Sequence, residues 1–160
     1  MKHTIISSSI EETIEIGRIL GTQLNSKILI GLNGDIGCGK THFTKGIALG
    51  LNIKDNIKSP TFNLISEYTD GVLPLYHFDV YRLESIDELY LIGFEDYVKS
   101  NGVVVIEWTS LIESILPKDT NYITISKDAL EENKRIIEFN FSLEYDYILK
   151  NLIDILNKEV

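Results

Sequence analysis

The eight residues GDIGCGKT, from Gly34 to Thr41, constrain the fold of this chain more than any other stretch. They match the pattern G-x-x-x-x-G-K-[ST], in which a glycine-rich loop turns backbone N–H groups toward phosphate oxygens at the start of a helix. A compact apolar run over residues 27–33 predicts a buried strand before the loop. Helix-compatible residues follow the loop as far as Gly50. Strand, glycine loop and helix therefore come in the order that a phosphate-binding P-loop requires.

Each residue type in this loop has a chemical reason. Glycine lets the backbone approach a ligand closely and adopt turns that other residues avoid. The Lys40 ammonium would reach the β- and γ-phosphates, and the Thr41 hydroxyl would bind Mg²⁺. The alternative is a glycine-rich turn whose Lys-Thr pair only begins a helix. The candidate nucleotide-binding residues at the loop are Asp35, Gly37, Cys38, Gly39, Lys40, Thr41 and His42.

Cys38 is the only cysteine and stands at a helix N-terminus, where the pKa of a thiol tends to fall. We therefore hypothesise that its oxidation would block nucleotide binding. The alternative is a small residue that the loop tolerates. One cysteine allows no disulfide within the chain, which is typical of proteins in a reducing cytoplasm.

The composition, with 44% hydrophobic and 24% charged residues, favours one globular domain over residues 1–160. A net charge of −9 argues against a free-standing nucleic-acid binder, which would usually carry a basic surface. The three arginines, Arg18, Arg82 and Arg135, lie outside the loop, and none is obviously placed beside the phosphates. No apolar run approaches the roughly 20 residues of a membrane span, and no signal peptide is recognisable. We therefore expect a cytoplasmic protein with no membrane attachment.

The rest of the chain alternates helix and strand patterns. A serine cap and helical apolar spacing predict a helix over 9–24, and Asp70-Gly71 between two strand-like runs predicts a hairpin. Pro74 in the second run would remove a hydrogen-bond donor, which indicates an edge strand or a bulge. An uninterrupted apolar run predicts a buried parallel strand over 103–106. The remaining predicted elements are a short helix from Ser85 broken at Gly93, a helical turn over 94–99, strands over 122–126 and 134–141, and a C-terminal helix over 144–158.

Together these elements predict an α/β, P-loop NTPase-like domain with a central, mostly parallel sheet, an antiparallel hairpin and flanking helices. A two-residue turn at Asp70-Gly71 would place Phe62 opposite Asp79 and Thr61 opposite Val80. The loop that contains Thr61 is therefore expected beside Asp79.

Two acids follow strand-like apolar runs, at the edge where open α/β sheets bind their ligands. Asp79 and Glu107 are candidates to hold Mg²⁺ or to orient an attacking water, and the alternative for each is a helix cap or a solvated carboxylate. Thr61 suits a switch that contacts Mg²⁺ and the γ-phosphate only while ATP is bound, and the alternative is a simple turn threonine. Trp108 would fill the core, or lie over the nucleotide or at a partner surface. His77 is interpreted as structural or solvent-facing rather than catalytic.

Five segments occur together in an order and at a spacing that resemble one family, the bacterial YjeE/TsaE proteins. They are LNGDIGCGKT, KSPTFNLISEY, LPLYHFDVYRLESIDEL, VVVIEW and ILP. The resemblance implies an ATPase subunit of tRNA threonylcarbamoyladenosine synthesis that acts with two partners, TsaB and TsaD. In that family TsaD transfers the threonylcarbamoyl group from its adenylate to the adenosine next to the anticodon, in tRNAs reading codons that start with A. The TsaE-like subunit binds and hydrolyses ATP without making the adenylate, and tRNA reaches it only through the complex.

The resemblance also assigns roles by motif position. It implies that Gly37 to Thr41 bind phosphates and that Thr41 and Glu107 hold Mg²⁺. Thr13 and Arg135 align with family positions that contact the nucleotide. Lys40, Thr61, Asp79 and Glu107 are the candidate catalytic residues, and Trp108 matches the tryptophan of the family. The chain departs from the family at Cys38, where alanine is usual, at His42, where threonine or serine is usual, and at Thr109-Ser110, where proline or alanine followed by glutamate is common.

Three functions remain open from the sequence. The first is a slow ATPase that the TsaB–TsaD pair stimulates. A small-molecule or nucleoside kinase is the second, although such kinases need an arginine-bearing lid. The third is a module that senses the nucleotide without hydrolysing it. Phosphoryl transfer to an acceptor would favour the kinase, and full function of variants lacking Glu107 or Asp79 would favour the sensor.

Overall fold

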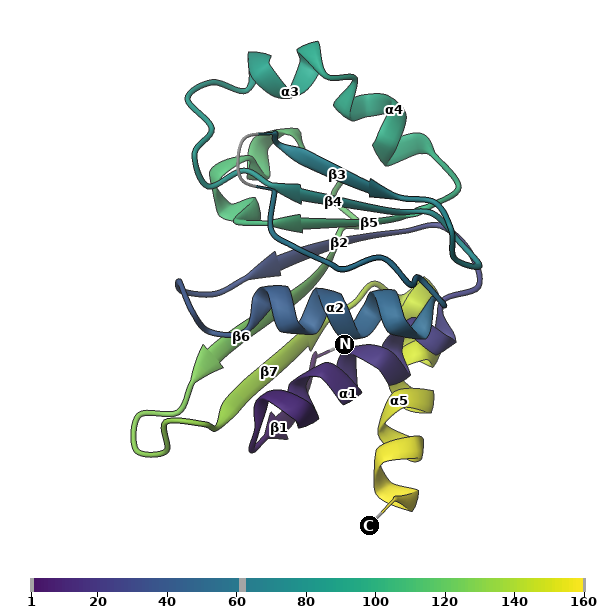
Figure 1. The fold of residues 1–160 in the computed structure, drawn as a ribbon, viewed down its shortest axis with the longest axis vertical. Coiled ribbons are helices and arrows are strands. Elements are labelled where there is room, and N and C mark those ends of the chain that lie inside the picture. The colour runs from purple at the N-terminus through teal and green to yellow at the C-terminus, as the bar shows by residue number, and fades with distance from the viewer. Residues whose placement is uncertain (1, 61–62, 160) are drawn as a thin grey trace.

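The computed structural model describes residues 2–60 and 63–159. Within them, a seven-stranded sheet runs in the order β1-β7-β6-β2-β5-β4-β3 and carries helices on both faces (Figure 1). The strands are β1 (Lys2–Ser7), β2 (Ile28–Asn33), β3 (Ile65–Tyr68), β4 (Leu75–Asp79), β5 (Val103–Glu107), β6 (Asn121–Lys127) and β7 (Arg135–Asn140). The helices are α1 (Ile10–Gln23), α2 (Lys40–Gly50), α3 (Asp87–Leu91), α4 (Phe94–Lys99) and α5 (Asp146–Lys158), with short 3₁₀ turns η1 (Thr109–Leu111), η2 (Glu113–Ile115) and η3 (Leu143–Tyr145).

The sheet is mixed. Its four central strands, β6, β2, β5 and β4, run parallel, and antiparallel pairs extend it at both edges. The predicted α/β fold with an antiparallel hairpin and flanking helices is therefore confirmed. Strand β5 lies between the parallel strands β2 and β4 and has all five residues buried, as expected for a parallel strand covered on both faces. Among the described residues, no helix is both long and apolar enough to cross a bilayer.

Two hydrophobic clusters flank the sheet, one on each face. Helices α1, α2 and α5 cover the face of the larger cluster, and α3 and α4 cover the other face over β5, β4 and β3 (Figure 1). Alternate residues of β5 pack on opposite faces of the sheet, because successive side chains of a strand point in opposite directions. Val103 and Val105 join the larger cluster, and Val104 and Ile106 join the smaller one. The same alternation turns Glu107 toward α2.

Helices α1 and α2 pack with their backbones almost in contact, because glycines face each other along both. A Cβ added to Gly17 would lie 2.5 Å from the Phe43 carbonyl oxygen, and one added to Gly46 would lie 2.1 Å from the Ile14 carbonyl oxygen. Gly21 and Gly50 form a similar contact one turn further on. Since a real Cβ does not approach so closely, only glycine allows this packing. The helix that begins with Lys40 is thus fixed firmly against its neighbour.

The other predicted helices and strands occur within a few residues of the expected positions. At the start of α1, the Ser9 hydroxyl accepts a hydrogen bond from the Glu12 amide at 3.1 Å, which is the predicted serine cap. Gly93 separates α3 from α4 with a φ of 79°, as the predicted break requires. One strand has no counterpart in the sequence analysis. It is β1, which pairs antiparallel with β7 at the edge of the sheet.

The predicted register of the hairpin is wrong. Ile65 pairs with Phe78 and Tyr68 with Leu75, which is two positions away from the register of a two-residue turn. The shift is even, so every side chain keeps the face that was expected. The Pro74 prediction is also wrong, because Pro74 precedes β4, an internal strand between β3 and β5. Thr61 and Phe62 lie outside the described residues.

Candidate nucleotide and metal site

The loop between β2 and α2 has the backbone that the motif predicts. Gly34, Gly37 and Gly39 have φ values of 145°, 75° and 108°, which side-chain-bearing residues rarely adopt. A Cβ on Gly34 would in addition lie 2.2 Å from the Ile125 carbonyl oxygen of β6. The loop leads directly into α2, whose first amide groups have no acceptor within the helix. These amides and the helix dipole favour an anion at this place.

Lys40 is held inside this loop. Its ammonium donates hydrogen bonds to the carbonyl oxygens of Gly34 at 2.7 Å and Asp35 at 2.9 Å. It also lies 4.4 Å from the centre of the Trp108 ring, which is a cation–π contact. The side chain is buried, so the positive charge is directed into the site and away from bulk water. Lys40 and Trp108, separated by 68 positions in sequence, thus come together in the fold.

The loop borders a cavity of about 710 Å³, large enough for a nucleotide. Most of the predicted site residues line it, including Asp79, Glu107 and His42. The lining also includes residues that the sequence analysis did not propose as site residues, among them Ser59, Tyr81 and Arg82. Among the described residues the lining consists of Ile36, Gly37, Gly39, Lys40, Thr41, His42, Ser59, Pro60, Asn63, Leu64, Asp79, Tyr81, Arg82, Glu88, Glu107 and Trp108.

Oxygen atoms gather where α2 meets the end of β5. The hydroxyls of Thr41 and Ser59 are 2.8 Å apart, and the Ser59 hydroxyl donates to Glu107 Oε2 at 3.5 Å. Glu107 is 2% exposed, and its Oε1 has no hydrogen-bond partner among the described residues. An orphaned buried carboxylate oxygen beside two hydroxyls is a donor set that suits Mg²⁺. The residues therefore fit the predicted metal.

The described residues include no group of three or more His, Cys, Asp and Glu side chains that could hold a metal alone. This agrees with magnesium chemistry, because Mg²⁺ commonly binds through one or two carboxylates together with phosphates and water. A metal at Thr41 and Glu107 would therefore take its remaining ligands from phosphate or water.

The two acids differ in their electrostatics. Burial raises the pKa of Asp79 and the adjacent Glu107 carboxylate raises it further, although the Tyr81 amide that donates to Asp79 acts in the opposite direction. For Glu107, burial alone would raise the pKa, but His77, Asp79 and Lys40 outweigh it and the pKa lies below its usual range. Glu107 is thus the constant anion of the pair, and Asp79 the carboxylate that binds a proton more readily.

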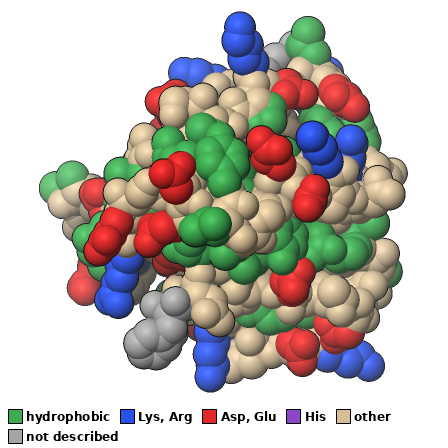
Figure 2. Space-filling view, turned by 90° about the horizontal axis from the view of Figure 1, so that it is seen from above, with side chains coloured by type: hydrophobic (Ala, Val, Ile, Leu, Met, Phe, Trp, Pro, Cys, Tyr) green, Lys and Arg blue, Asp and Glu red, His purple; other side chains and the backbone are tan. Residues whose placement is uncertain are grey.

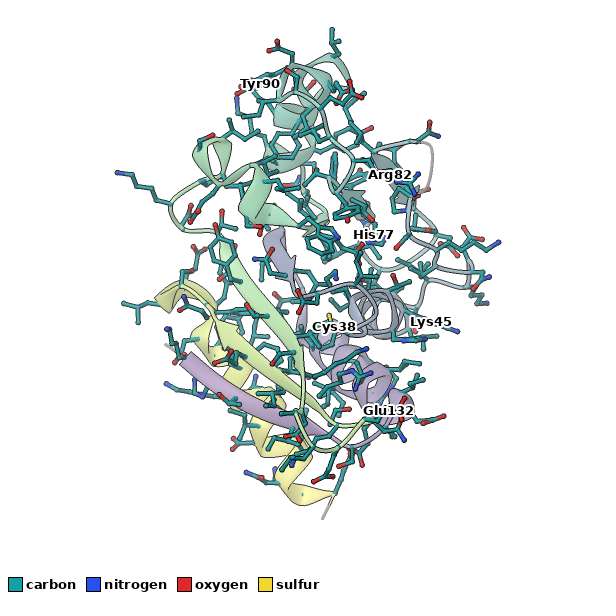
Figure 3. The ribbon with its side chains drawn as sticks, turned by 90° about the vertical axis from the view of Figure 1, so that its left-hand side faces the viewer. Cys38, Lys45, His77, Arg82, Tyr90 and Glu132 are labelled. Carbon is teal, nitrogen blue, oxygen red and sulfur yellow. The ribbon has the colours of Figure 1, made fainter. Side chains whose placement is uncertain are left out.

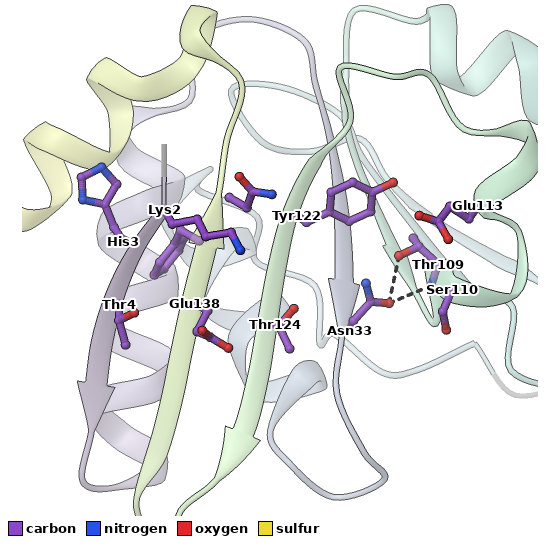
Figure 4. A pocket seen from close by; sticks show the side chains of 12 residues that line it. Lys2, His3, Thr4, Asn33, Thr109, Ser110, Glu113, Tyr122, Thr124 and Glu138 are labelled. Atoms are coloured by element: carbon purple, nitrogen blue, oxygen red, sulfur yellow. Dashed lines mark hydrogen bonds between the residues drawn. The ribbon is translucent and has the colours of Figure 1, made fainter.

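The Trp108 ring forms one wall of the cavity and packs against Tyr81, with the ring centres 4.7 Å apart. Its backbone has a φ of 65°, unusual for a residue with a side chain. Asn33 stabilises the backbone that follows Trp108. Its Oδ1 accepts hydrogen bonds from the Thr109 amide and hydroxyl, both at 2.9 Å (Figure 4). Asn33 and Thr109 also line a second cavity of about 370 Å³, on the sheet face that carries α3 and α4, in the part that these helices leave uncovered (Figure 4).

Other predicted nucleotide contacts stand beside the loop and not in the cavity. Thr13 is buried next to Gly39, but its hydroxyl bonds to Ser7 at 2.6 Å and to the Ser9 carbonyl oxygen at 3.2 Å. The Arg135 guanidinium donates to the Cys38 carbonyl oxygen at 2.8 Å and so braces the outside of the loop.

Arg82 borders the cavity and is exposed (Figure 3). The reactivity predicted for Cys38 needs correction. The Cys38 thiol is 1% exposed, and burial raises its pKa, although Lys40 and Arg135 act to lower it. The expected fall in the thiol pKa at the helix N-terminus is therefore wrong, because burial outweighs the nearby positive charge.

The fold and the glycine loop define the chain as a P-loop NTPase-like domain. Residues 7–137 match the model of the family described as "Threonylcarbamoyl adenosine biosynthesis protein TsaE". The chain is 44% identical to the tRNA threonylcarbamoyladenosine biosynthesis protein TsaE of Bacillus subtilis, over 78% of this chain and 77% of that protein. It is 42% identical to the protein of the same description in Treponema pallidum, over 82% of this chain and 96% of that one.

A solved structure agrees with these relatives. The crystal structure of Bacillus subtilis YdiB superposes with a TM-score of 0.80 at 34% sequence identity, over 96% of this chain and 95% of that one. The chain therefore belongs to the TsaE family, and its role lies in the biosynthesis of tRNA threonylcarbamoyladenosine.

Proposed function

We propose that this chain is the Mg²⁺-dependent, ATP-binding and ATP-hydrolysing subunit of that pathway, acting in the cytoplasm with TsaB and TsaD. The modified base would be the adenosine adjacent to the anticodon in tRNAs reading codons that start with A. One observation carries the proposal. Lys40, Thr41 and Glu107, which begin α2 and end β5, meet at the wall of a cavity of about 710 Å³.

The proposed roles follow from position. The loop amides up to Thr41 hold the phosphates, and the Lys40 ammonium leaves the carbonyl oxygens of Gly34 and Asp35 to contact them. The Thr41 hydroxyl and the Glu107 carboxylate hold Mg²⁺, which when bound neutralises charge on the transferred phosphoryl group. Asp79, whose pKa is raised by burial, orients the attacking water and accepts its proton. Thr61 remains our proposed switch residue and lies outside the described residues.

Dependence on partners is supported by charge. Arg82 borders the cavity but is exposed, and an arginine must be fixed against the phosphates to accelerate hydrolysis. The net charge of −9 favours a chain that reaches tRNA through other subunits. The surface above α3 and α4 mixes acidic with hydrophobic side chains, which suits a protein partner better than RNA (Figure 2). We therefore expect slow hydrolysis by the chain alone.

The test is ATP turnover by the chain alone and with TsaB and TsaD, with tRNA modification scored in the same reactions. We expect slow basal turnover, clear stimulation by the partners, and loss of both signals in Lys40→Ala and Glu107→Ala. Lys45→Ala is the matched control, because Lys45 lies on α2 and is exposed. Fast turnover that ignores the partners would contradict the proposal. Phosphoryl transfer to a small acceptor would support a kinase, and normal modification by Glu107→Ala would support a sensor without hydrolysis.

A further inference from the structure

His77 is a buried, unassigned side chain beside the proposed metal site. It is fully shielded from solvent, and among the described residues neither of its ring nitrogens has a hydrogen-bond partner. Buried polar atoms without partners are costly, so a protein that keeps them has a reason. A carboxylate oxygen that also lacks a hydrogen-bond partner among the described residues, Glu107 Oε1, lies 3.7 Å from His77 Nε2. The two orphaned groups thus face each other.

The sheet fixes this arrangement. Strands β4 and β5 are parallel neighbours in which His77 pairs with Val105 and Asp79 with Glu107. His77 is therefore the diagonal neighbour of Glu107 on the same face, one pair closer to the core. The ring comes from the interior of β4, and in the view of Figure 3 it lies between the labelled side chains of Arg82 and Cys38. A side chain held this way has little freedom to turn elsewhere.

We propose that His77 is a positioning residue for Glu107, whose carboxylate it orients for the metal by donating from Nε2 to Oε1. The inference rests on the proposed function, because it assigns a task at the same site. At 3.7 Å the two atoms are just beyond hydrogen-bond distance, so a small rotation of the carboxylate completes the bond. The other oxygen, Oε2, then stays toward Ser59 and Thr41. Residues behind a metal ligand commonly hold it in this manner.

The surroundings of His77 argue against a purely structural role for its ring. Among the described residues nothing hydrogen-bonds to its nitrogens, so no hydrogen bond from the ring fixes a loop or a helix. A residue needed only to fill the core would carry no polar atoms, since an apolar ring of similar size avoids their desolvation. The other histidine that faces a carboxylate, His3, lies 3.4 Å from Asp146 and far from the loop, on β1. It provides a matched comparison.

The experiment measures the affinity for a non-hydrolysable ATP analogue by calorimetry, once in EDTA and once in excess Mg²⁺. The magnesium gain is the dissociation constant in EDTA divided by the dissociation constant in Mg²⁺. Thermal melting checks that each variant folds. The variants are His77→Phe, which removes the donor, His77→Gln, whose amide reaches the Nε2 position, and His77→Asn, whose amide reaches only the Nδ1 position. His3→Phe is the control.

We expect the magnesium gain to fall about 10–100-fold in His77→Phe and His77→Asn. It should stay within about threefold of wild type in His77→Gln and His3→Phe. A purely structural role would weaken binding equally in EDTA and in Mg²⁺ and leave the gain unchanged, and that result would overturn the inference. Loss of the gain in His77→Gln as well would also overturn it. If His77→Phe does not fold, the inference is tested by comparing the magnesium gain of His77→Gln with that of His77→Asn. Absence of any magnesium gain in the wild-type chain would instead contradict the proposed function.

Discussion

At the scale of single residues, Cys38 gives the sharpest prediction. Its thiol is 1% exposed and burial raises its pKa, so little reactive thiolate exists at neutral pH. We expect alkylation by iodoacetamide to be at least about tenfold slower in the folded chain than in the chain unfolded by urea. The rate should rise with pH, because deprotonation precedes reaction. Alkylation as fast as that of the unfolded chain would show that the thiol is accessible and activated, as the sequence suggested.

Local sequence predicts the loop residues well and the residues opposite them poorly. Gly34, Lys40 and Thr41 follow from the motif because the loop is built from adjacent positions. Ser59 and Arg82 carry no local signal, since each reaches the cavity only when distant segments fold together. The orientation of the Thr13 hydroxyl toward Ser7 likewise depends on β1, which the sequence did not reveal.

At the scale of elements, the contact between α1 and α2 predicts an unusual response to alanine. On intrinsic helix propensity, Gly46→Ala should stabilise α2 by nearly 1 kcal/mol. The added Cβ would lie 2.1 Å from the Ile14 carbonyl oxygen, however, so we expect destabilisation of about 1–3 kcal/mol in urea unfolding. Lys45→Ala, one position away and exposed, is the control and should change stability little. An increase in stability for Gly46→Ala would mean that the helices separate at no cost.

The hairpin shows why a good local signal can mislead. Asp70-Gly71 favours a two-residue turn, but both residues contact the segment after α2. The Asp70 carboxylate accepts from the Lys54 amide at 3.1 Å, and a Cβ on Gly71 would lie 2.4 Å from the Leu51 carbonyl oxygen. These contacts lengthen the connection and move the register. Strand β1 was missed for a related reason, because its pairing with β7 is entirely nonlocal.

At the scale of the whole molecule, Asp146 joins the two ends of the chain. Its carboxylate accepts from Lys150 at 3.1 Å within α5 and faces His3 of β1 at 3.4 Å. The hydrogen bond from Lys150, followed by that from His3, lowers the pKa of Asp146 in the folded chain. Protonation therefore favours unfolding. The contribution of Asp146 to folding stability is complete above the pKa of an unfolded aspartate, about 3.9. It is lost as the pH falls through the lower pKa that Asp146 has in the folded chain.

We therefore expect Asp146→Asn to lower the melting temperature at pH 7, and the difference from wild type to shrink in acid below the folded pKa. Asp154→Asn on the same helix is the control, since Asp154 is exposed and has no ion pair among the described residues. A deficit for Asp146→Asn that persists unchanged in acid would assign the effect to packing and not to charge.

Trp108 has a further consequence, because it is the only tryptophan in the chain and its ring contacts both Lys40 and Tyr81. All tryptophan fluorescence of the protein therefore originates at the wall of one cavity. An ammonium 4.4 Å from an indole affects its emission, so displacement of Lys40 toward an arriving phosphate changes the signal. The protein thus contains a built-in optical probe of its own loop, which needs no label and has no competing emitter of the same kind.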